Sequence, residues 1–181
     1  MAKLKIGDNL PNFTLPATDG NSYEAQTLLD QSAALIVVFT CNHCPYVVAW
    51  EDRINHLARR YAEQGVKLVA INSNDAVKYP ADSFEKMILR SQQKEFSFPY
   101  LHDASQQVAH SYGAERTPEL FIFDRAGTLT YHGALDDNYD DEKAVKHPYA
   151  QQAVEAILAQ HEVVFAETAP VGCTIKWKPT K

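Results

Sequence analysis

Residues 33–39 form a continuous apolar run rich in valine and isoleucine, and residues 66–71 form a second, mostly apolar run that contains Lys67. Runs of this length and composition are typical of strands that are covered on both faces of a sheet. Between them, five apolar side chains recur at every third or fourth position: Val47, Trp50, Ile54, Leu57 and Tyr61. This spacing predicts one face of an amphipathic helix that ends near Gly65. A strand, a helix and a strand in this order predict a βαβ unit with parallel strands.

The pattern next to this unit predicts further elements. Apolar residues on both sides of the turn-forming residues 18–21 indicate a short hairpin ahead of the core. Pro80 predicts the start of a helix whose first turn is acidic and whose later turns are basic. A shorter helix is predicted over 104–112, and it ends at Gly113.

The last third of the chain combines strand and helix patterns. Apolar runs at 120–123 and 129–131 flank the turn Asp124-Arg125-Ala126-Gly127, which predicts an antiparallel hairpin. A final helix is predicted over about 148–160. The residues that follow it have no helical period, so we predict an extended C-terminal tail.

A length of 181 residues predicts a single domain over residues 1–181, with its core at about 30–161 and its tail at about 162–181. Hydrophobic residues make up 45% and charged residues 22%, which is the balance of an ordinary globular protein. The formal net charge of −6 argues against nucleic acid or an anionic membrane as the main partner. No apolar run reaches the roughly 20 residues of a membrane span, and no signal-peptide core is visible at the N-terminus. We therefore expect a cytoplasmic protein.

Two cysteines three positions apart follow the first apolar run, in the motif Cys41-Asn42-His43-Cys44-Pro45. If the helix begins at this motif, Cys41 caps it and Cys44 lies one turn later on the same face, ~5–6 Å away. That separation lies inside the window of roughly 4.4–6.8 Å between Cα atoms that a disulfide requires. Unpaired N–H groups at a helix start favour a thiolate, so we expect a lowered pKa at Cys41. The pair is predicted to open and close as a redox switch.

The βαβ unit with this motif at its first strand-to-helix junction, followed by Thr117-Pro118 ahead of a hairpin, resembles the thioredoxin superfamily. Further residues extend the resemblance to its peroxiredoxin-like (AhpC/TSA-like) branch over almost the whole chain: Gly7, Pro11, Phe13, Leu15, Asp19-Gly20, Phe98-Pro99, Asp103, Ala109, Tyr112-Gly113-Ala114, Phe121-Ile122-Phe123-Asp124, Gly127, Asp136-Asp137-Asn138 and Gly172-Cys173-Thr174-Ile175-Lys176-Trp177. The resemblance implies an α/β thioredoxin-like fold. Such a fold has a central mixed sheet with helices on both faces, here with an N-terminal β-hairpin and an extended C-terminal tail.

Two positions depart from the patterns of better-known branches. Peroxiredoxins carry a proline seven positions and a hydroxyl residue three positions before the peroxidatic cysteine, whereas Ala34 and Val38 stand there before Cys41. The residues that shape a peroxide pocket are therefore missing, which weighs against efficient peroxidase activity. Thioredoxins place tryptophan before the first cysteine, whereas this chain has Thr40.

The resemblance implies roles for the residues of the motif. Cys41 is the attacking thiol and Cys44 is the thiol that resolves the mixed disulfide. His43 lies between them, as in the Cys-x-His-Cys motif of disulfide-forming periplasmic oxidoreductases, and it either stabilises a thiolate or is a solvent-facing residue without a role. Pro118 is implied to be a cis-proline that faces the dithiol and aims the backbone of Thr117 at an extended client segment.

Two further residues each have two possible interpretations. Arg116 either lends positive potential near the dithiol or is an exposed loop residue. Cys173 lies in a patterned tail, so it is either a third thiol that packs back near the dithiol or an inert, buried residue.

The leading hypothesis is a thiol–disulfide oxidoreductase that exchanges electrons through a Cys41–Cys44 dithiol or disulfide bond. Its clients are protein or small-molecule disulfides, and its electron donor is a reducing dithiol protein or glutathione. One alternative is a weak thiol-dependent peroxidase with antioxidant activity, which uses Cys41. The other is a metal-binding module in which the two cysteines, with His43 or Cys173, hold Cu(I) or Zn(II). No nucleotide, flavin or haem motif is visible, so no cofactor is expected.

Overall fold

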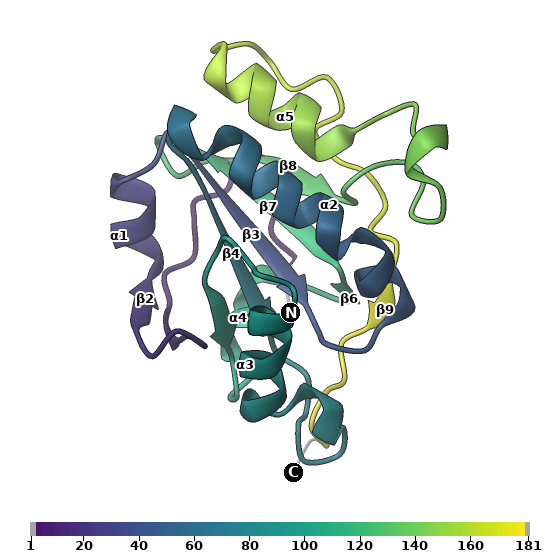
Figure 1. Cartoon of the computed structure of the whole chain (residues 1–181). Coiled ribbons are helices and arrows are strands. Elements are labelled where there is room, and N and C mark those ends of the chain that lie inside the picture. The colour runs from purple at the N-terminus through teal and green to yellow at the C-terminus, as the bar shows by residue number, and fades with distance from the viewer. Residues whose placement is uncertain (1–2, 180–181) are drawn as a thin grey trace.

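A five-stranded mixed sheet forms the centre of the computed structural model, which describes residues 3–179 (Figure 1). The strand order is β5-β4-β3-β7-β8, and every residue of the central strand β3 (Ala34–Thr40) is buried. On one side lie two strands parallel to it, β4 (Val66–Asn72) and β5 (Tyr100–His102). On the other side lies an antiparallel hairpin, β7 (Glu119–Asp124) and β8 (Leu129–Gly133). The two apolar runs of the sequence are neighbouring parallel strands, as predicted.

Helices cover both faces of the sheet. Alternate side chains of β3 point to opposite faces, and they are buried on both. Ile36 and Val38 join a core beneath three helices, which are α2 (Pro45–Tyr61), α3 (Phe84–Gln93) and α5 (Tyr149–Leu158). Leu35, Val37 and Phe39 join the opposite core. That core is covered by α1 (Ala25–Asp30), α4 (Gln107–Tyr112) and a hairpin of β1 (Thr14–Pro16) and β2 (Ser22–Glu24). The predicted mixed sheet with helices on both faces is confirmed.

A separate pair of short strands lies near the end of β3. The strand β6 (Arg116–Thr117) comes just before β7, and β9 (Cys173–Thr174) pairs with it antiparallel. Figure 1 shows the yellow C-terminal tail passing the start of α2, beside β6. The tail is extended, as predicted, and it returns to the end of the sheet that carries the cysteine motif. The predicted division into one domain with core and tail remains a prediction.

The start of α2 differs from the sequence prediction. The helix begins at Pro45, and Cys44 is its N-cap residue, so Cys41 lies ahead of the helix and does not cap it. Proline is well suited to the first helical position, because its missing N–H has no partner there. The helix continues into the 3-10 helix η1 (Ala62–Gln64) and ends at Gly65, whose φ of 81° is the left-handed cap that the sequence predicts.

The helix predicted from Pro80 is also different. Pro80 opens only a 3-10 helix, η2 (Pro80–Asp82), and α3 begins after Ser83. The Ser83 hydroxyl accepts a hydrogen bond from the backbone N–H of Lys86 at 3.4 Å, which caps α3. Asp82 therefore lies outside the α-helix, and it is completely buried, whereas the sequence predicts it in the acidic first turn of the helix.

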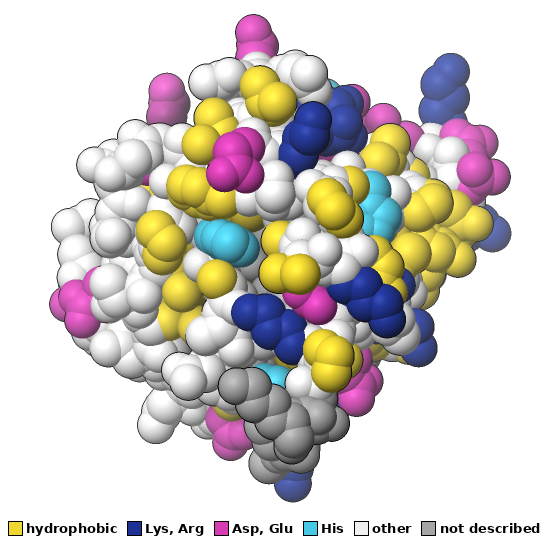
Figure 2. Space-filling model, turned by 90° about the horizontal axis from the view of Figure 1, so that it is seen from below, with side chains coloured by type: hydrophobic (Ala, Val, Ile, Leu, Met, Phe, Trp, Pro, Cys, Tyr) yellow, Lys and Arg dark blue, Asp and Glu magenta, His cyan; other side chains and the backbone are white. Residues whose placement is uncertain are grey.

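The surface combines charges of both signs. Figure 2 shows one face of the molecule, on which basic, acidic and hydrophobic side chains are interspersed. Within residues 3–179, no helix combines the length and the apolar character that crossing a membrane requires. The helix α5 is preceded by a third 3-10 helix, η3 (Glu142–Ala144), in an acidic loop.

Candidate functional site

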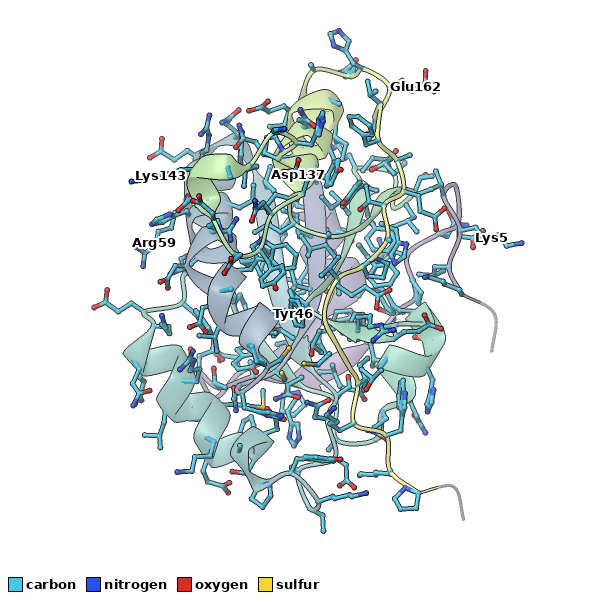
Figure 3. All side chains as sticks on the ribbon, turned by 90° about the vertical axis from the view of Figure 1, so that its right-hand side faces the viewer. Lys5, Tyr46, Arg59, Asp137, Lys143 and Glu162 are labelled. Atoms are coloured by element: carbon cyan, nitrogen blue, oxygen red, sulfur yellow. The ribbon has the colours of Figure 1, made fainter. Side chains whose placement is uncertain are left out.

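The two cysteines of the motif lie in the loop that joins β3 to α2, where the central strand ends. Burial leaves only 4% of Cys41 and 1% of Cys44 exposed. They form a small cluster with Val47 and with two partly buried neighbours, Tyr46 and Cys173. Figure 3 shows sulfur atoms close to Tyr46, at the start of α2. The structure therefore brings together all three cysteines of the chain.

Thr117 contacts the dithiol from the opposite side. Its peptide bond to Pro118 is cis, as the family resemblance implies. The Thr117 hydroxyl lies 3.5 Å from Cys41 Sγ, and a protonated Cys44 thiol donates a hydrogen bond to the Thr117 carbonyl oxygen at 3.3 Å. A single residue therefore offers a polar group to each sulfur of the pair.

The two thiols of the motif differ strongly in their affinity for a proton. The pKa of Cys44 is lowered to about 4, chiefly because the Cys41 thiol donates a hydrogen bond to it. The pKa of Cys41 is raised by the same hydrogen bond and by burial. Two thiols coupled in this way titrate as a pair, which loses one proton early and retains the other. The lowered pKa expected at Cys41 is thus found at Cys44, the residue that occupies the helix start.

Asp82 is a fully buried carboxylate that the sequence analysis did not assign to the site. One oxygen accepts hydrogen bonds from the backbone N–H of Asn42 at 2.7 Å and from the Asn72 side chain at 3.2 Å. The other oxygen accepts a hydrogen bond from the Asn74 side chain at 2.8 Å and lies 2.9 Å from His43 Nδ1. Asp82 therefore holds both middle residues of the motif in place.

His43 is consequently fixed by a carboxylate, although 38% of its side chain is exposed. Cys41, His43 and Asp82 form the one group of three metal-ligating side chains, within residues 3–179, whose ligand atoms all lie within 4.8 Å of one another. The metal alternative predicted from the sequence uses the two cysteines of the motif with His43 or Cys173, but not Asp82. Each Asp82 oxygen already has two hydrogen-bonding neighbours, so a metal ion at this position has to replace existing contacts.

A second buried carboxylate, Glu119, supports the segment that carries Thr117. It accepts hydrogen bonds from the backbone N–H groups of Glu115 and Arg116, both at 2.7 Å. Its other oxygen lies 2.7 Å from Nε2 of His132, which is also buried. Glu119 was not predicted as a site residue, although a glutamate at the head of the apolar run 120–123 is a signal for a buried carboxylate with partners.

The C-terminal tail occupies the edge of β6. Cys173 is in register with Thr117, and Arg116 Nη1 donates a hydrogen bond to the Gly172 carbonyl oxygen at 3.3 Å. Cys173 is partly exposed and packs against the cluster that Cys41 and Cys44 form with Val47. The tail therefore packs back on the dithiol, and Arg116 contacts the tail. Where the resemblance implies an extended client segment beside Thr117, the structure has the chain's own β9 paired with that residue.

Comparisons with known proteins agree with this architecture. Residues 5–147 match the protein family described as Redoxin. The thiol-disulfide oxidoreductase ResA of Bacillus thuringiensis (strain Al Hakam) is 26% identical over 131 residues, which are 70% of this chain and 68% of that protein. A solved structure of a hypothetical protein from Sinorhizobium meliloti 1021 has a TM-score of 0.92 and 37% identity, and covers 99% of this chain and 98% of its own. An uncharacterized conserved protein from Geobacillus kaustophilus has a TM-score of 0.92 and 38% identity, with coverages of 98% and 94%.

Proposed function

The chain belongs to the Redoxin family and is a thiol–disulfide oxidoreductase, and we propose that Cys41 and Cys44 carry out its reaction. The observation that carries this proposal is that the two buried thiols pack together and each lies against Thr117, the residue before the cis-proline. The pKa of Cys44 is lowered and that of Cys41 is raised, so the pair holds one thiolate and one thiol. A thiolate is the nucleophile of disulfide exchange, and a neighbouring thiol is needed to resolve the mixed disulfide. The thioredoxin-like fold places both at the end of a buried strand.

Thr117 is suited to moving the negative charge between the two sulfurs. When the shared proton lies on Cys44, that thiol donates to the Thr117 carbonyl oxygen. The thiolate is then on Cys41, where the Thr117 hydroxyl is placed to donate to it. Although the pKa of Cys41 is raised, transfer of one proton along the hydrogen bond supplies the nucleophile.

The proposed reaction has two exchange steps. Cys41 Sγ attacks one sulfur of the client disulfide, and the other client sulfur leaves as a thiolate that takes up a proton. Cys44 Sγ then attacks Cys41 Sγ, which releases the second client thiol and closes the Cys41–Cys44 disulfide. The client gains two electrons and the protein loses two, so an external thiol has to reduce the protein before the next cycle.

We further propose that the clients are protein or small-molecule disulfides, and that a dithiol protein or glutathione supplies the electrons. Support comes from the ResA relatives, which are thiol-disulfide oxidoreductases, and from the absence of a cofactor motif in the sequence. We also propose that the protein works in the cytoplasm, because an odd number of cysteines is unusual for a secreted disulfide scaffold. Fractionation of native cells tests the compartment.

The experiment that tests the reaction measures turnover with insulin and with glutathione disulfide, and with hydrogen peroxide as the third substrate. Cys41→Ser is expected to abolish disulfide turnover, and Cys44→Ser is expected to accumulate mixed disulfides. Full disulfide-reductase activity in both variants would refute the assignment. Faster turnover with peroxide than with either disulfide would instead make the peroxidase hypothesis correct.

A further inference from the structure

The third cysteine of the chain is held against the dithiol by the fold and not by a flexible arm. The strand β9 places Cys173 opposite Thr117, whose two polar groups face the other two sulfurs. Gly172 approaches Thr117 so closely that a Cβ added to it would come within 2.2 Å of the Thr117 carbonyl oxygen. All three cysteines of the chain therefore lie around one residue.

The tail is anchored on both sides of Cys173. Before it, the Thr168 backbone N–H donates to the His132 carbonyl oxygen at 2.9 Å, and the Thr168 hydroxyl lies 2.8 Å from the Tyr131 hydroxyl. After it, Ile175 is buried in the core, and its backbone N–H donates to the Glu115 carbonyl oxygen at 3.0 Å. These contacts fix the position of Cys173 without the help of a bond to sulfur.

Cys173 is more exposed to solvent than the two cysteines of the motif. Cys41 and Cys44 are 4% and 1% exposed, whereas Cys173 is only partly buried. An external thiol, glutathione included, has less access to a disulfide between the two buried residues than to Cys173. The same reductant reaches Cys173 from solvent, on the side of the tail.

We propose that Cys173 is a third redox-active thiol, which takes over the disulfide from Cys41 and presents it to the reductant. This inference rests on the proposed function. Cys173 Sγ attacks Cys44 Sγ of the Cys41–Cys44 disulfide, so that the Cys44–Cys173 bond forms and the Cys41–Cys44 bond breaks. Cys41 leaves as a thiolate and takes up the proton that Cys173 gives away. The oxidation state of the protein is unchanged, and the dithiol protein or glutathione then attacks Cys173.

The charges around Cys173 favour this step only in the oxidised protein. In the reduced protein the pKa of Cys173 is raised to about 11, by burial first and then by its hydrogen bond with Cys44 and the charge there. When Cys44 is part of a disulfide, that charge is gone, while Lys176 and Arg116 still lower the pKa of Cys173. The pKa of the third thiol therefore falls when there is a disulfide for it to receive.

Disulfide mapping tests the proposal. The full-length protein is oxidised with glutathione disulfide, quenched with acid, alkylated and digested, and its linked peptides are identified by mass spectrometry. The variants are Cys41→Ser, Cys173→Ser and, as a matched control, Thr174→Ala, whose exposed side chain lies on the other side of the same strand. Circular dichroism and thermal unfolding establish that each variant is folded.

The expected results are specific. Cys41→Ser forms a Cys44–Cys173 disulfide, and the wild type contains this pair together with Cys41–Cys44. Oxidised Cys173→Ser contains only the Cys41–Cys44 pair, and glutathione reduces it about tenfold more slowly than the wild type, which corresponds to ~1.4 kcal/mol in the barrier. Thr174→Ala behaves as the wild type does.

Two results would overturn the relay. One is the absence of the Cys44–Cys173 pair from both the wild type and Cys41→Ser, and the other is an unchanged reduction rate in Cys173→Ser. In either case a Cys41–Cys44 disulfide that still forms leaves the proposed function standing. If no disulfide forms between any of the cysteines, the proposed function fails as well.

Discussion

Replacing Asp82 is expected to damage both the fold and the balance of charge in the site. In Asp82→Ala, three donors lose their acceptor: the backbone N–H of Asn42 and the side-chain amides of Asn72 and Asn74. A buried donor without a partner costs about 1–3 kcal/mol, and removal of one member of a buried charged network costs about 3–5 kcal/mol. Because the three donors share one acceptor, we expect the free energy of unfolding to fall by about 3–5 kcal/mol. For a protein of this size that is a decrease in Tm of roughly 10 °C.

The isosteric change Asp82→Asn isolates the effect of the Asp82 charge on the pKa of Cys41. The negative charge of Asp82 contributes to the raised pKa of Cys41, and its ligand atom lies within 4.8 Å of the Cys41 sulfur. Removing the charge is therefore expected to lower the pKa of Cys41. The assay is the rate of alkylation of the reduced protein as a function of pH, followed with Cys44→Ser in the background so that one motif thiol remains.

Asp103→Asn is the matched control for this prediction. Asp103 is also fully buried, and it accepts hydrogen bonds from the Ser73 hydroxyl and the Ala109 backbone N–H, both at 2.9 Å. Its replacement is expected to lower Tm without changing the pH profile of alkylation. If Asp82→Asn and Asp103→Asn have the same profile as the parent, or if Asp82→Ala unfolds at the parental Tm, the role assigned to Asp82 is wrong.

Three further predictions concern the thiols and the segments that hold them. Because the pKa of Cys44 is lowered from 9.0 to about 4, the reduced protein has stability that is present at pH 9 and is lost as the pH falls towards 4. Thermal unfolding over that range is expected to show this loss, and Cys41→Ala, which lacks the hydrogen-bond donor responsible, is expected to show less of it. Gly172→Ala brings a methyl group within 2.2 Å of the Thr117 carbonyl oxygen, so we expect a loss of about 1–3 kcal/mol and faster proteolysis of the tail. Glu119→Gln removes a buried charge that accepts two backbone hydrogen bonds, and chemical denaturation is expected to show a loss of about 1–3 kcal/mol.

The parts of the fold that follow from local patterns were predictable. The apolar runs, the spacing from Val47 to Tyr61 and the turn at Gly127 each describe a segment that buries one face or reverses direction within a few residues. The cysteine motif and Thr117-Pro118 were found for the same reason, since each is a short signature. Their contact in space followed only from the resemblance to a known family, because 76 positions separate Cys41 from Thr117.

The contacts of Asp82 with the cysteine motif were not predictable, because an acidic residue at this position is already explained by the start of a helix. An acidic residue two positions after Pro80 fits the first turn of a helix, where it interacts with the helix dipole. Ser83 is a preferred N-cap residue, and this preference predicts that the helix begins at Phe84 with Asp82 outside it. Even that correction does not predict burial, which results from donors on a separate strand and loop that converge on the carboxylate.

The tail shows most clearly what a motif leaves open. A Cys-x-x-Cys sequence predicts a pair of thiols, and no residue close to it in the chain indicates a third thiol. The strand that delivers Cys173 has only two residues, so its pairing with β6 carries no hydrophobic pattern that a sequence could reveal. What specifies the contact is the absence of a side chain at Gly172, which lets the tail lie against the Thr117 carbonyl. The number of thiols in the site is thus decided by a backbone contact more than 120 residues away from the motif, and a glycine in the tail is as informative about this chemistry as the cysteines themselves.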